Sequence, residues 1–277
     1  MTSSTIDLVP HRPPAVLCVD ATLKDMDLAE GRLRAADGNA LRRTDGRLDP
    51  FTGVEALAQL AAAYIAFTVS EPALKAGMLV GIDHVQLPGP LRDDGDYLLR
   101  ARKTAALGDV TAFDGELLRD GVNLLRGRLK VWVGRSLPEP PRVPPCPPAA
   151  ADLQEPAPPG DRLAAAMLGH LRGLSRSDGV AEGVFAFPGS FPGFAGHFPG
   201  APVLPGVLVL KLGELMASLA AGVPLRPLGV ERAKFARPVR PGEPLRVAAA
   251  AAAGLFKCVA TVGGAPAAAF TMAMERL

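Results

Sequence analysis

Residues 196–208, Gly-His-Phe-Pro-Gly-Ala-Pro-Val-Leu-Pro-Gly-Val-Leu, place His197 in a loop that leads directly into an apolar helix. The prolines fix the backbone φ angle, and Gly200 and Gly206 permit close approach of other backbone segments. The first amides of the helix, those of Gly206 and Val207, have no acceptor inside it and can bind a developing oxyanion. The stretch therefore predicts a rigidly held general base. The simpler alternative is a loop histidine whose ring is hydrogen-bonded to the backbone.

The same order of elements occurs twice along the chain. A helix that is apolar nearly all round is expected at 54–69 and again at 207–220. Alternating apolar and polar residues after these helices predict strands at 78–87, 96–104, 110–119 and 123–133, and at 228–239, 244–253, 255–262 and 265–275. Such helices must be covered on several sides, which a curved antiparallel sheet does. The expected fold class is α+β, with two such units side by side.

A proline-rich stretch divides the chain. Between Ser136 and Gly160, ten of 25 residues are proline, which excludes a helix or a central strand and predicts an extended linker. We therefore expect an N-terminal unit at 1–135, a linker at 136–160 and a C-terminal unit at 161–277. Each unit has the size of one small domain.

Several segments together resemble one enzyme family. The run around His197 resembles the active-site loop of the FabA/FabZ-type 3-hydroxyacyl-acyl-carrier-protein dehydratases, which have the hotdog fold. Residues 8–20 (LVPHRPPAVLCVD) resemble their LPHR-x-P…LLVD opening, and 55–59 (EALAQ) resemble the E-A-M-A-Q that carries their catalytic acid. Residues 233–245 (AKFARPVRPGEPL) are similar to a strand and turn of the family. The resemblance implies a double hotdog, an internal pseudo-dimer of two fused copies.

Each half lacks one of the two catalytic residues of that family. In the C-terminal half the position of the family acid is Lys211, fourteen residues after His197. In the N-terminal half the acid is present as Glu55, but Leu41 stands fourteen residues before it. In the family dimers the histidine of one subunit works with the acid of the other. The resemblance therefore implies one composite site, His197 with Glu55, and one inactive site lined by Leu41 and Lys211.

Glu55 has a purely structural alternative. Thr52 and Glu55 are spaced as in a capping box, in which the threonine caps the helix and the glutamate bonds back to its amide. The helix dipole stabilises the anion and burial destabilises it, so its protonation state is open. Gln59, one turn later, is expected to orient the carboxylate. Glu214 is a rival acid, although an i,i+3 ion pair with Lys211 is its simpler explanation.

Other polar residues have simpler explanations. His11 is expected to be structural, with its ring tied to the backbone. His84 and His170 have no supporting context and are expected at the surface or hydrogen-bonded within the fold. Ser190, in the run PGSFPG, is expected to be part of a loop and not a nucleophile.

Composition limits the class of protein further. A net charge of +2 argues against a nucleic-acid binder. The three cysteines are far apart and not in a CxxC pattern, so neither a disulfide framework nor a metal site is suggested. The N-terminus has no signal-peptide pattern and no apolar run reaches membrane-spanning length, which favours a cytoplasmic protein without membrane contact. No nucleotide-binding or metalloprotease motif is present.

The resemblance implies loss of water from a 3-hydroxyacyl thioester. His197 would remove the acidified α-hydrogen, and amides near Gly206 would polarise the thioester carbonyl. Glu55 would position the 3-hydroxyl as it leaves, giving a trans-2-enoyl thioester. No metal or redox cofactor is required. An acyl carrier protein, or CoA, would carry the substrate in fatty-acid, polyketide or aryl-polyene biosynthesis.

Two other functions and one docking surface are left open. A hotdog thioesterase would use the same carboxylate and helix amides for hydrolysis. A non-catalytic partner of another dehydratase or ketosynthase would explain the inactive half. Four cations near residues 232–240, namely Arg232, Lys234, Arg237 and Arg240, either meet an acidic carrier protein or form a solvated strand face. Further homo-oligomerisation is also open.

Overall fold

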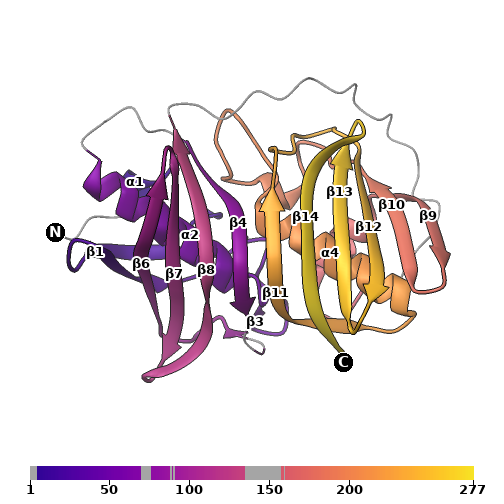
Figure 1. Cartoon of the computed structure of the whole chain (residues 1–277), viewed down its shortest axis with the longest axis horizontal. Coiled ribbons are helices and arrows are strands. Elements are labelled where there is room, and N and C mark those ends of the chain that lie inside the picture. Colours follow the sequence, from indigo (N-terminus) through magenta and orange to yellow (C-terminus); the bar gives the residue numbers. More distant parts are fainter. Residues whose placement is uncertain (1–4, 70–75, 88, 90, 135–156, 159) are drawn as a thin grey trace.

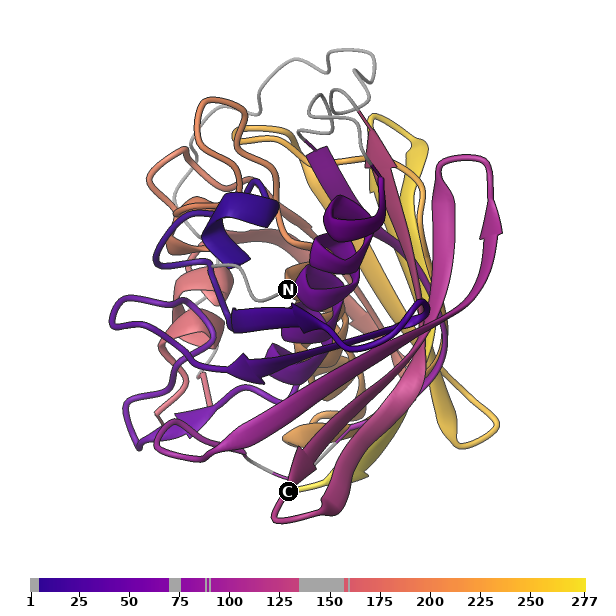
Figure 2. The same ribbon diagram turned by 90° about the vertical axis from the view of Figure 1, so that its left-hand side faces the viewer.

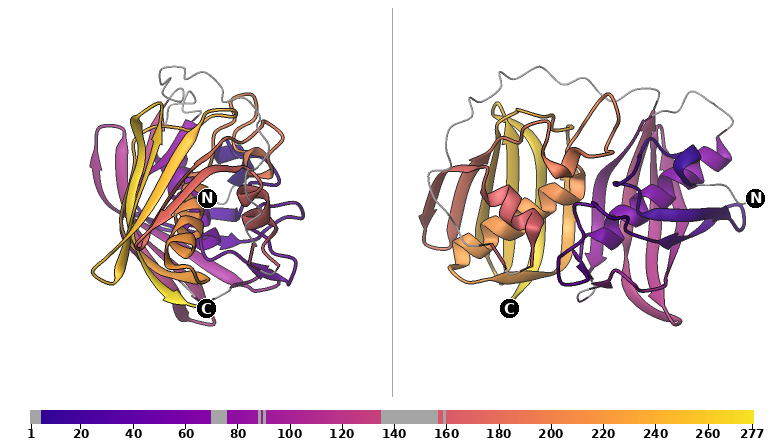
Figure 3. Two further views of the ribbon diagram at one scale, coloured as in Figure 1. Left: turned by 90° about the vertical axis from the view of Figure 1, so that its right-hand side faces the viewer. Right: turned by 180° about the vertical axis from the view of Figure 1, so that it is seen from behind.

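A single curved sheet of twelve antiparallel strands carries two buried helices on one face. The computed structural model describes the chain except residues 1–4, 70–75, 88, 90, 135–156 and 159. The helices are α2 (Thr52–Thr68) and α4 (Gly206–Ala221), and they lie on the same side of the sheet (Figures 1 and 3). Both helix predictions are confirmed within two residues at each end. The sheet bends around the helices in the side view (Figure 2).

The strand order of the N-terminal half is mirrored by that of the C-terminal half on the other side of the centre of the sheet. From edge to edge it is β1-β2-β6-β7-β8-β4-β11-β14-β13-β12-β10-β9. The N-terminal half supplies β1 (Cys18–Leu23), β2 (Leu28–Leu33), β4 (Ala76–Gln86), β6 (Tyr97–Leu107), β7 (Val110–Arg119) and β8 (Val122–Gly134). The C-terminal half supplies β9 (Leu171–Ser177), β10 (Val180–Phe185), β11 (Leu225–Phe235), β12 (Leu245–Ala252), β13 (Leu255–Val262) and β14 (Ala265–Arg276). The chain is thus a double hotdog.

The two halves join edge to edge at the middle of the sheet. Strands β4 and β11 pair antiparallel, from Gln86 opposite Gly229 to Gly81 opposite Lys234. One hydrophobic core contains residues of both halves and of both helices. Every residue of α2 from Thr52 to Ile65 is buried, which fits a helix that is apolar nearly all round.

Smaller elements complete each half. They are α1 (Thr5–Leu8), the paired β3 (Arg47–Leu48) and β5 (Leu91–Arg92), α3 (Arg162–Leu168) and the 3₁₀ turn η1 (Pro192–Phe194). The proline-rich linker expected at 136–160 lies almost wholly outside the described residues, so the unit boundaries stay a prediction. Cys18 and Cys258 are buried and form no disulfide among the described residues. Among the helices that the structure describes, none combines the length and apolar character needed to cross a membrane.

The start of α2 shows that the capping-box alternative for Glu55 is wrong. Thr52 is already the first helical residue, and its buried hydroxyl has no hydrogen-bond partner among the described residues. Asp49 shapes the turn before the helix instead, because its Oδ1 accepts a 3.0 Å hydrogen bond from the Phe51 amide. The carboxylate of Glu55 is therefore available for contacts outside its own helix.

Candidate functional site

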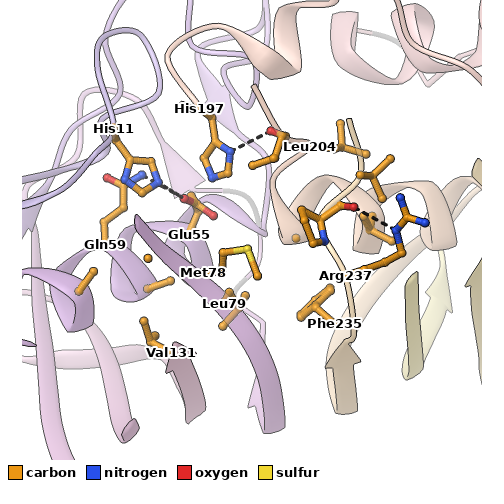
Figure 4. A pocket seen from close by; sticks show the side chains of 18 of the residues that line it. His11, Glu55, Gln59, Met78, Leu79, Val131, His197, Leu204, Phe235 and Arg237 are labelled. Atoms are coloured by element: carbon orange, nitrogen blue, oxygen red, sulfur yellow. Dashed lines mark hydrogen bonds and ion pairs between the residues drawn. The ribbon is translucent and has the colours of Figure 1, made fainter. Parts of the chain in front are cut away.

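Three titratable side chains from both halves meet in one buried cluster (Figure 4). His11 lies in the loop after α1, Glu55 in the first turn of α2, and His197 in the loop before α4. The His11 Nε2 atom is 3.3 Å from Glu55 Oε1, and the His11 and His197 rings have centroids 4.9 Å apart. One polar atom of each side chain lies within 4.8 Å of the other two. His197 and Glu55 are therefore close enough to serve one substrate.

The loop that carries His197 is pressed against the N-terminal half. Gly196 has a φ of +78°, and its carbonyl accepts a 3.0 Å hydrogen bond from the Arg12 amide. A Cβ at this position would lie 2.0 Å from the Arg12 carbonyl oxygen, so only glycine fits. The expected close backbone approach thus occurs at Gly196. It does not occur at Gly200, where a Cβ would meet open space, nor at Gly206, where a Cβ would make ordinary contacts with Phe235.

His197 is held as a neutral base. Its Nδ1 lies 2.9 Å from the Val203 carbonyl oxygen, which can only accept, so Nδ1 carries the proton and donates. Burial and the neighbouring His11 lower the pKa of His197 to about 4, against the opposing effect of Glu55. Its Nε2 has no hydrogen-bond partner among the residues that the structure describes. The alternative, a ring that is hydrogen-bonded to the backbone, therefore holds for Nδ1 only. The Nε2 atom can accept a proton.

Glu55 is held as an anion. Gln59 donates a 3.1 Å hydrogen bond to Glu55 Oε1, and the Gln59 side chain is itself fixed by the amides of Leu17 and Cys18. Burial alone raises the pKa of Glu55. The close approach of His11, the hydrogen bond from Gln59 and, in acid, the charge of His197 outweigh burial and lower this pKa to about 2.

His11 belongs to the cluster, and the expectation that its ring is tied to the backbone is wrong. The His11 ring is buried, and neither ring nitrogen has a well-aligned hydrogen bond to any described residue. The backbone contacts come from the next residue, Arg12, whose guanidinium donates to the carbonyls of Val9 and His11. A signal was available in the sequence, because His11 stands in the segment that resembles the opening of the family.

The other two histidines lie outside the cluster. His84 is exposed, with its Nδ1 2.9 Å from Glu231 Oε2. His170 packs edge-on against Phe187, with ring centroids 5.5 Å apart. Ser190 is an exposed turn residue, as expected.

Two cavities meet at the cluster. The first is lined by His11, Glu55, Gln59, His197 and Gly206 together with apolar residues, among them Ala58, Ala62, Met78, Leu79, Val131, Val209 and Phe235. The second is again lined by Glu55 and His197, with Leu17, Leu41, Pro205, Val207 and Leu208. The expectation that Leu41 faces the opposite pocket is therefore wrong, because Leu41 shares a cavity with both site residues.

The first turn of α4 offers hydrogen-bond donors beside these cavities. The amides of Gly206 and Val207 find no acceptor among the described residues, as expected for the start of a helix. Gly206 lines the first cavity and Val207 the second. Two amides without an acceptor thus border the two cavities at the site.

Lys211 lies in a buried ion cluster, whereas it was expected to line a second, inactive pocket together with Leu41. Its Nζ is 2.8 Å from Asp49 Oδ2, 2.9 Å from Asp161 Oδ2 and 2.9 Å from Glu214 Oε1. These side chains are almost fully buried, and Arg43 adds a second cation 3.3 Å from Asp161. The predicted i,i+3 pair between Lys211 and Glu214 is confirmed. Charged side chains of both halves thus fill the surroundings of Lys211.

The side chains of this ion cluster differ in how readily they keep a proton. The three carboxylates raise the pKa of Lys211 well above its usual value, although burial opposes this. Burial also opposes ionisation of Asp161, but Lys211 holds the pKa of Asp161 below its usual value. Glu214 is the carboxyl that keeps a proton most readily, because burial, Asp49 and Asp161 raise the pKa of Glu214 to about 7.

The basic strand and turn do not form one continuous surface. Arg232 and Lys234 are exposed on β11. Arg237 is instead largely buried, lines the first cavity and pairs with Glu243. Arg232 and Lys234 therefore offer exposed positive charge, whereas the Arg237 guanidinium does not.

Family models of two dehydratases match the two halves of the chain. The ApeP-like model (ApeP dehydratase) matches residues 4–139, and the ApeI-like model (ApeI dehydratase) matches residues 175–262. The dehydratase domain from the terminal module of the rifamycin polyketide synthase has a similar structure, with a TM-score of 0.51, 14% identity, and coverage of 96% of this chain and 98% of that one. An acyl-ACP thioesterase from Bacteroides thetaiotaomicron is also similar in structure, with a TM-score of 0.56 and 10% identity. The match covers 90% of this chain and 98% of that one. At these identities the structures show a shared fold only.

The similar curated proteins are 3-hydroxyacyl-[acyl-carrier-protein] dehydratases named FabZ. The enzyme of Chlamydia trachomatis is 40% identical over 82 residues, which cover 26% of this chain and 50% of that enzyme. The chain thus spans about half the length of this relative. The enzyme of Pelotomaculum thermopropionicum is 40% identical over 108 residues, which cover 35% of this chain and 72% of that enzyme. With the two family models and the double hotdog fold, these matches show that the chain belongs to the FabZ-type hotdog dehydratase family and has two domains of that family.

Proposed function

We propose that this chain removes water from 3-hydroxyacyl thioesters to give trans-2-enoyl thioesters at one composite site. The observation that carries the proposal is the buried pairing of a neutral His197 with the Glu55 carboxylate of the other half. The site lies between two cavities that are both lined by Glu55 and His197, which supports a substrate that binds across these two residues. The FabZ relatives act on acyl-carrier-protein substrates by name, which supports the same class of substrate here.

The protonation states of His197 and Glu55 assign a role to each side chain. His197 Nε2 takes the α-proton of the thioester, and the carbonyl oxygen gains negative charge that the Gly206 and Val207 amides stabilise. Glu55 is ionised, so it accepts a hydrogen bond from the 3-hydroxyl and does not donate a proton. The imidazolium formed at His197 then gives its Nε2 proton to the leaving hydroxyl. The carbon–oxygen bond breaks, water leaves and His197 returns to its neutral state.

The partner that delivers the substrate is an acyl carrier protein. The names of the FabZ relatives support this partner, and the exposed Arg232 and Lys234 offer positive charge to an acidic surface. The N-terminal unit at 1–135 and the C-terminal unit at 161–277 supply one half of the site each.

The first prediction tests the reaction itself. The purified chain is expected to remove one water from 3-hydroxyacyl groups on carrier protein, measured by mass spectrometry, with the CoA thioester as the comparison substrate. Release of free thiol without enoyl product would instead favour the thioesterase alternative. A lack of turnover by the chain alone, with turnover restored by a co-purified dehydratase or ketosynthase, would favour the non-catalytic partner. His84→Ala, outside the site, serves as the active control.

The second prediction concerns pH. The base form of His197 is the reactive one, and its pKa of about 4 keeps it neutral at physiological pH. We expect kcat/KM to stay level between about pH 8 and 5 and to fall about tenfold per pH unit below about 4. An acid limb near pH 6.5, the ordinary value for histidine, would contradict the proposed environment.

Acid unfolding must be separated from titration of the base. The depressed pKa values of His197 and Glu55 mean that the folded state binds fewer protons than the unfolded state. Their contribution to stability is therefore lost as pH falls, from about 6.5 toward 4 for His197 and from about 4.5 toward 2 for Glu55. Full recovery of activity on return to pH 7 shows that the acid limb is not caused by unfolding.

A further inference from the structure

The cluster of His11, Glu55 and His197 has the composition of a metal site. One polar atom of each side chain lies within 4.8 Å of the other two, and all three side chains are buried. Two imidazoles and one carboxylate form the protein ligand set of several zinc enzymes and of non-haem iron sites. We infer that this cluster binds a divalent transition cation, with Zn²⁺ as the best fit, and that the bound ion blocks the proposed dehydration. The blocking effect rests on the proposed function, whereas the binding does not.

The geometry is close to that of a tetrahedral site. Zinc bonds of about 2.0–2.2 Å at tetrahedral angles place neighbouring nitrogen and oxygen ligands about 3.3–3.6 Å apart. His11 Nε2 and Glu55 Oε1 already have a separation of 3.3 Å. Since no pair exceeds 4.8 Å, the polar atom of His197 has to approach by at most about 1.5 Å, a shift within the range of a side-chain adjustment.

The surroundings of the ligands also suit a metal. Ligating histidines usually donate their second ring N–H to a carbonyl, and ligating carboxylates usually accept a further hydrogen bond. His197 donates from Nδ1 to the Val203 carbonyl and leaves Nε2 free. Glu55 accepts from Gln59. The His11 nitrogens are buried without a well-aligned hydrogen bond to any described residue, and a bond from Nε2 to the ion would satisfy one of them.

Access and charge favour the same site. The first cavity is lined by all three side chains, so an ion can enter and a fourth position can hold water. The Glu55 carboxylate supplies the negative charge. The other buried group of carboxylates, Asp49, Asp161 and Glu214, already surrounds the Lys211 ammonium, which occupies the position that a metal cation would take.

Cobalt titration tests the site directly. Metal-free protein without an affinity tag is titrated with Co²⁺, whose visible spectrum reports coordination number, and then with Zn²⁺ in a calorimeter. We expect one ion per chain and an intense four-coordinate spectrum. His11→Ala and Glu55→Gln are each expected to weaken binding at least tenfold. His84→Ala and His170→Ala remove the two histidines outside the cluster and should leave binding unchanged.

Two further readouts complete the test. Because the ligands come from both halves, Zn²⁺ should raise the midpoint of thermal unfolding of the wild-type protein and not of His11→Ala. Zn²⁺ should also stop dehydration, and a chelator should restore it. A weak six-coordinate Co²⁺ spectrum, or equal affinity in wild type and His11→Ala, would overturn the inference. If a single ion binds as described but the chain never dehydrates a substrate, the metal site stands and the proposed function fails.

Discussion

Replacing His197 by alanine is expected to lower kcat/KM for dehydration by about 10²–10⁴-fold, the usual contribution of a positioned general base. The variant removes the Nε2 atom that accepts the α-proton and leaves the Glu55 carboxylate without a partner across the halves. Glu55→Gln is expected to cause a loss of similar size, because glutamine keeps the shape of the side chain and removes its charge. Initial rates on a 3-hydroxyacyl carrier-protein substrate measure both effects.

The double variant distinguishes a shared step from two separate defects. Groups that act in one step are strongly non-additive, so His197→Ala with Glu55→Gln should be little worse than either single change. Multiplication of the two losses would show that the side chains act independently. Full activity of Glu55→Gln with a lowered unfolding temperature would reduce Glu55 to a structural role. His170→Ala is the matched control, since it removes a partly buried histidine outside the site.

The central helices and the pairing of the halves could be predicted because their signals are local. An apolar helix and alternating strands can be recognised within single segments, and the fourteen-residue spacing between histidine and acid positions revealed the complementary losses. Strands β1, β2, β9 and β10 were not predicted. Each is short and carries glycine or charged residues, as in Leu28–Leu33 and Leu171–Ser177. Such segments become strands through pairing with their neighbours in the sheet and not through their own propensity.

The errors at the site arise from contacts between distant segments. His11 and Glu55 are 44 positions apart, and their contact depends on how the loop after α1 folds over α2. The capping-box alternative was wrong for the same reason. Asp49 accepts the hydrogen bond in the turn before α2, and the Glu55 carboxylate contacts His11 from a distant loop. Two of the three carboxylates around Lys211 could not be predicted either, because Asp49 and Asp161 come from two other loops. Local patterns predicted the partners one helical turn away, Gln59 for Glu55 and Glu214 for Lys211, but not the partners from distant loops.

Lys211→Met is expected to lower the free energy of unfolding by about 3–5 kcal/mol, the cost of removing one partner from a buried ion pair. Methionine keeps much of the side-chain volume, so the loss comes mainly from the carboxylates of Asp49, Asp161 and Glu214, which stay buried without their shared cation. This cluster contains neither His197 nor Glu55, and it links loops of both halves. Turnover per folded molecule should therefore change little. Urea unfolding and active-site-normalised rates measure the two quantities.

The pH dependence of this loss identifies its cause. Carboxylates that have lost Lys211 can regain neutrality by taking up protons, so the deficit should be larger at pH 8 than at pH 5. Lys257→Met, an exposed lysine on β13, is the matched control and should change stability by less than about 0.5 kcal/mol. A deficit that is equal at both pH values would instead point to lost packing around the side chain. A deficit below about 1 kcal/mol would show that the ion cluster does not hold the two halves together.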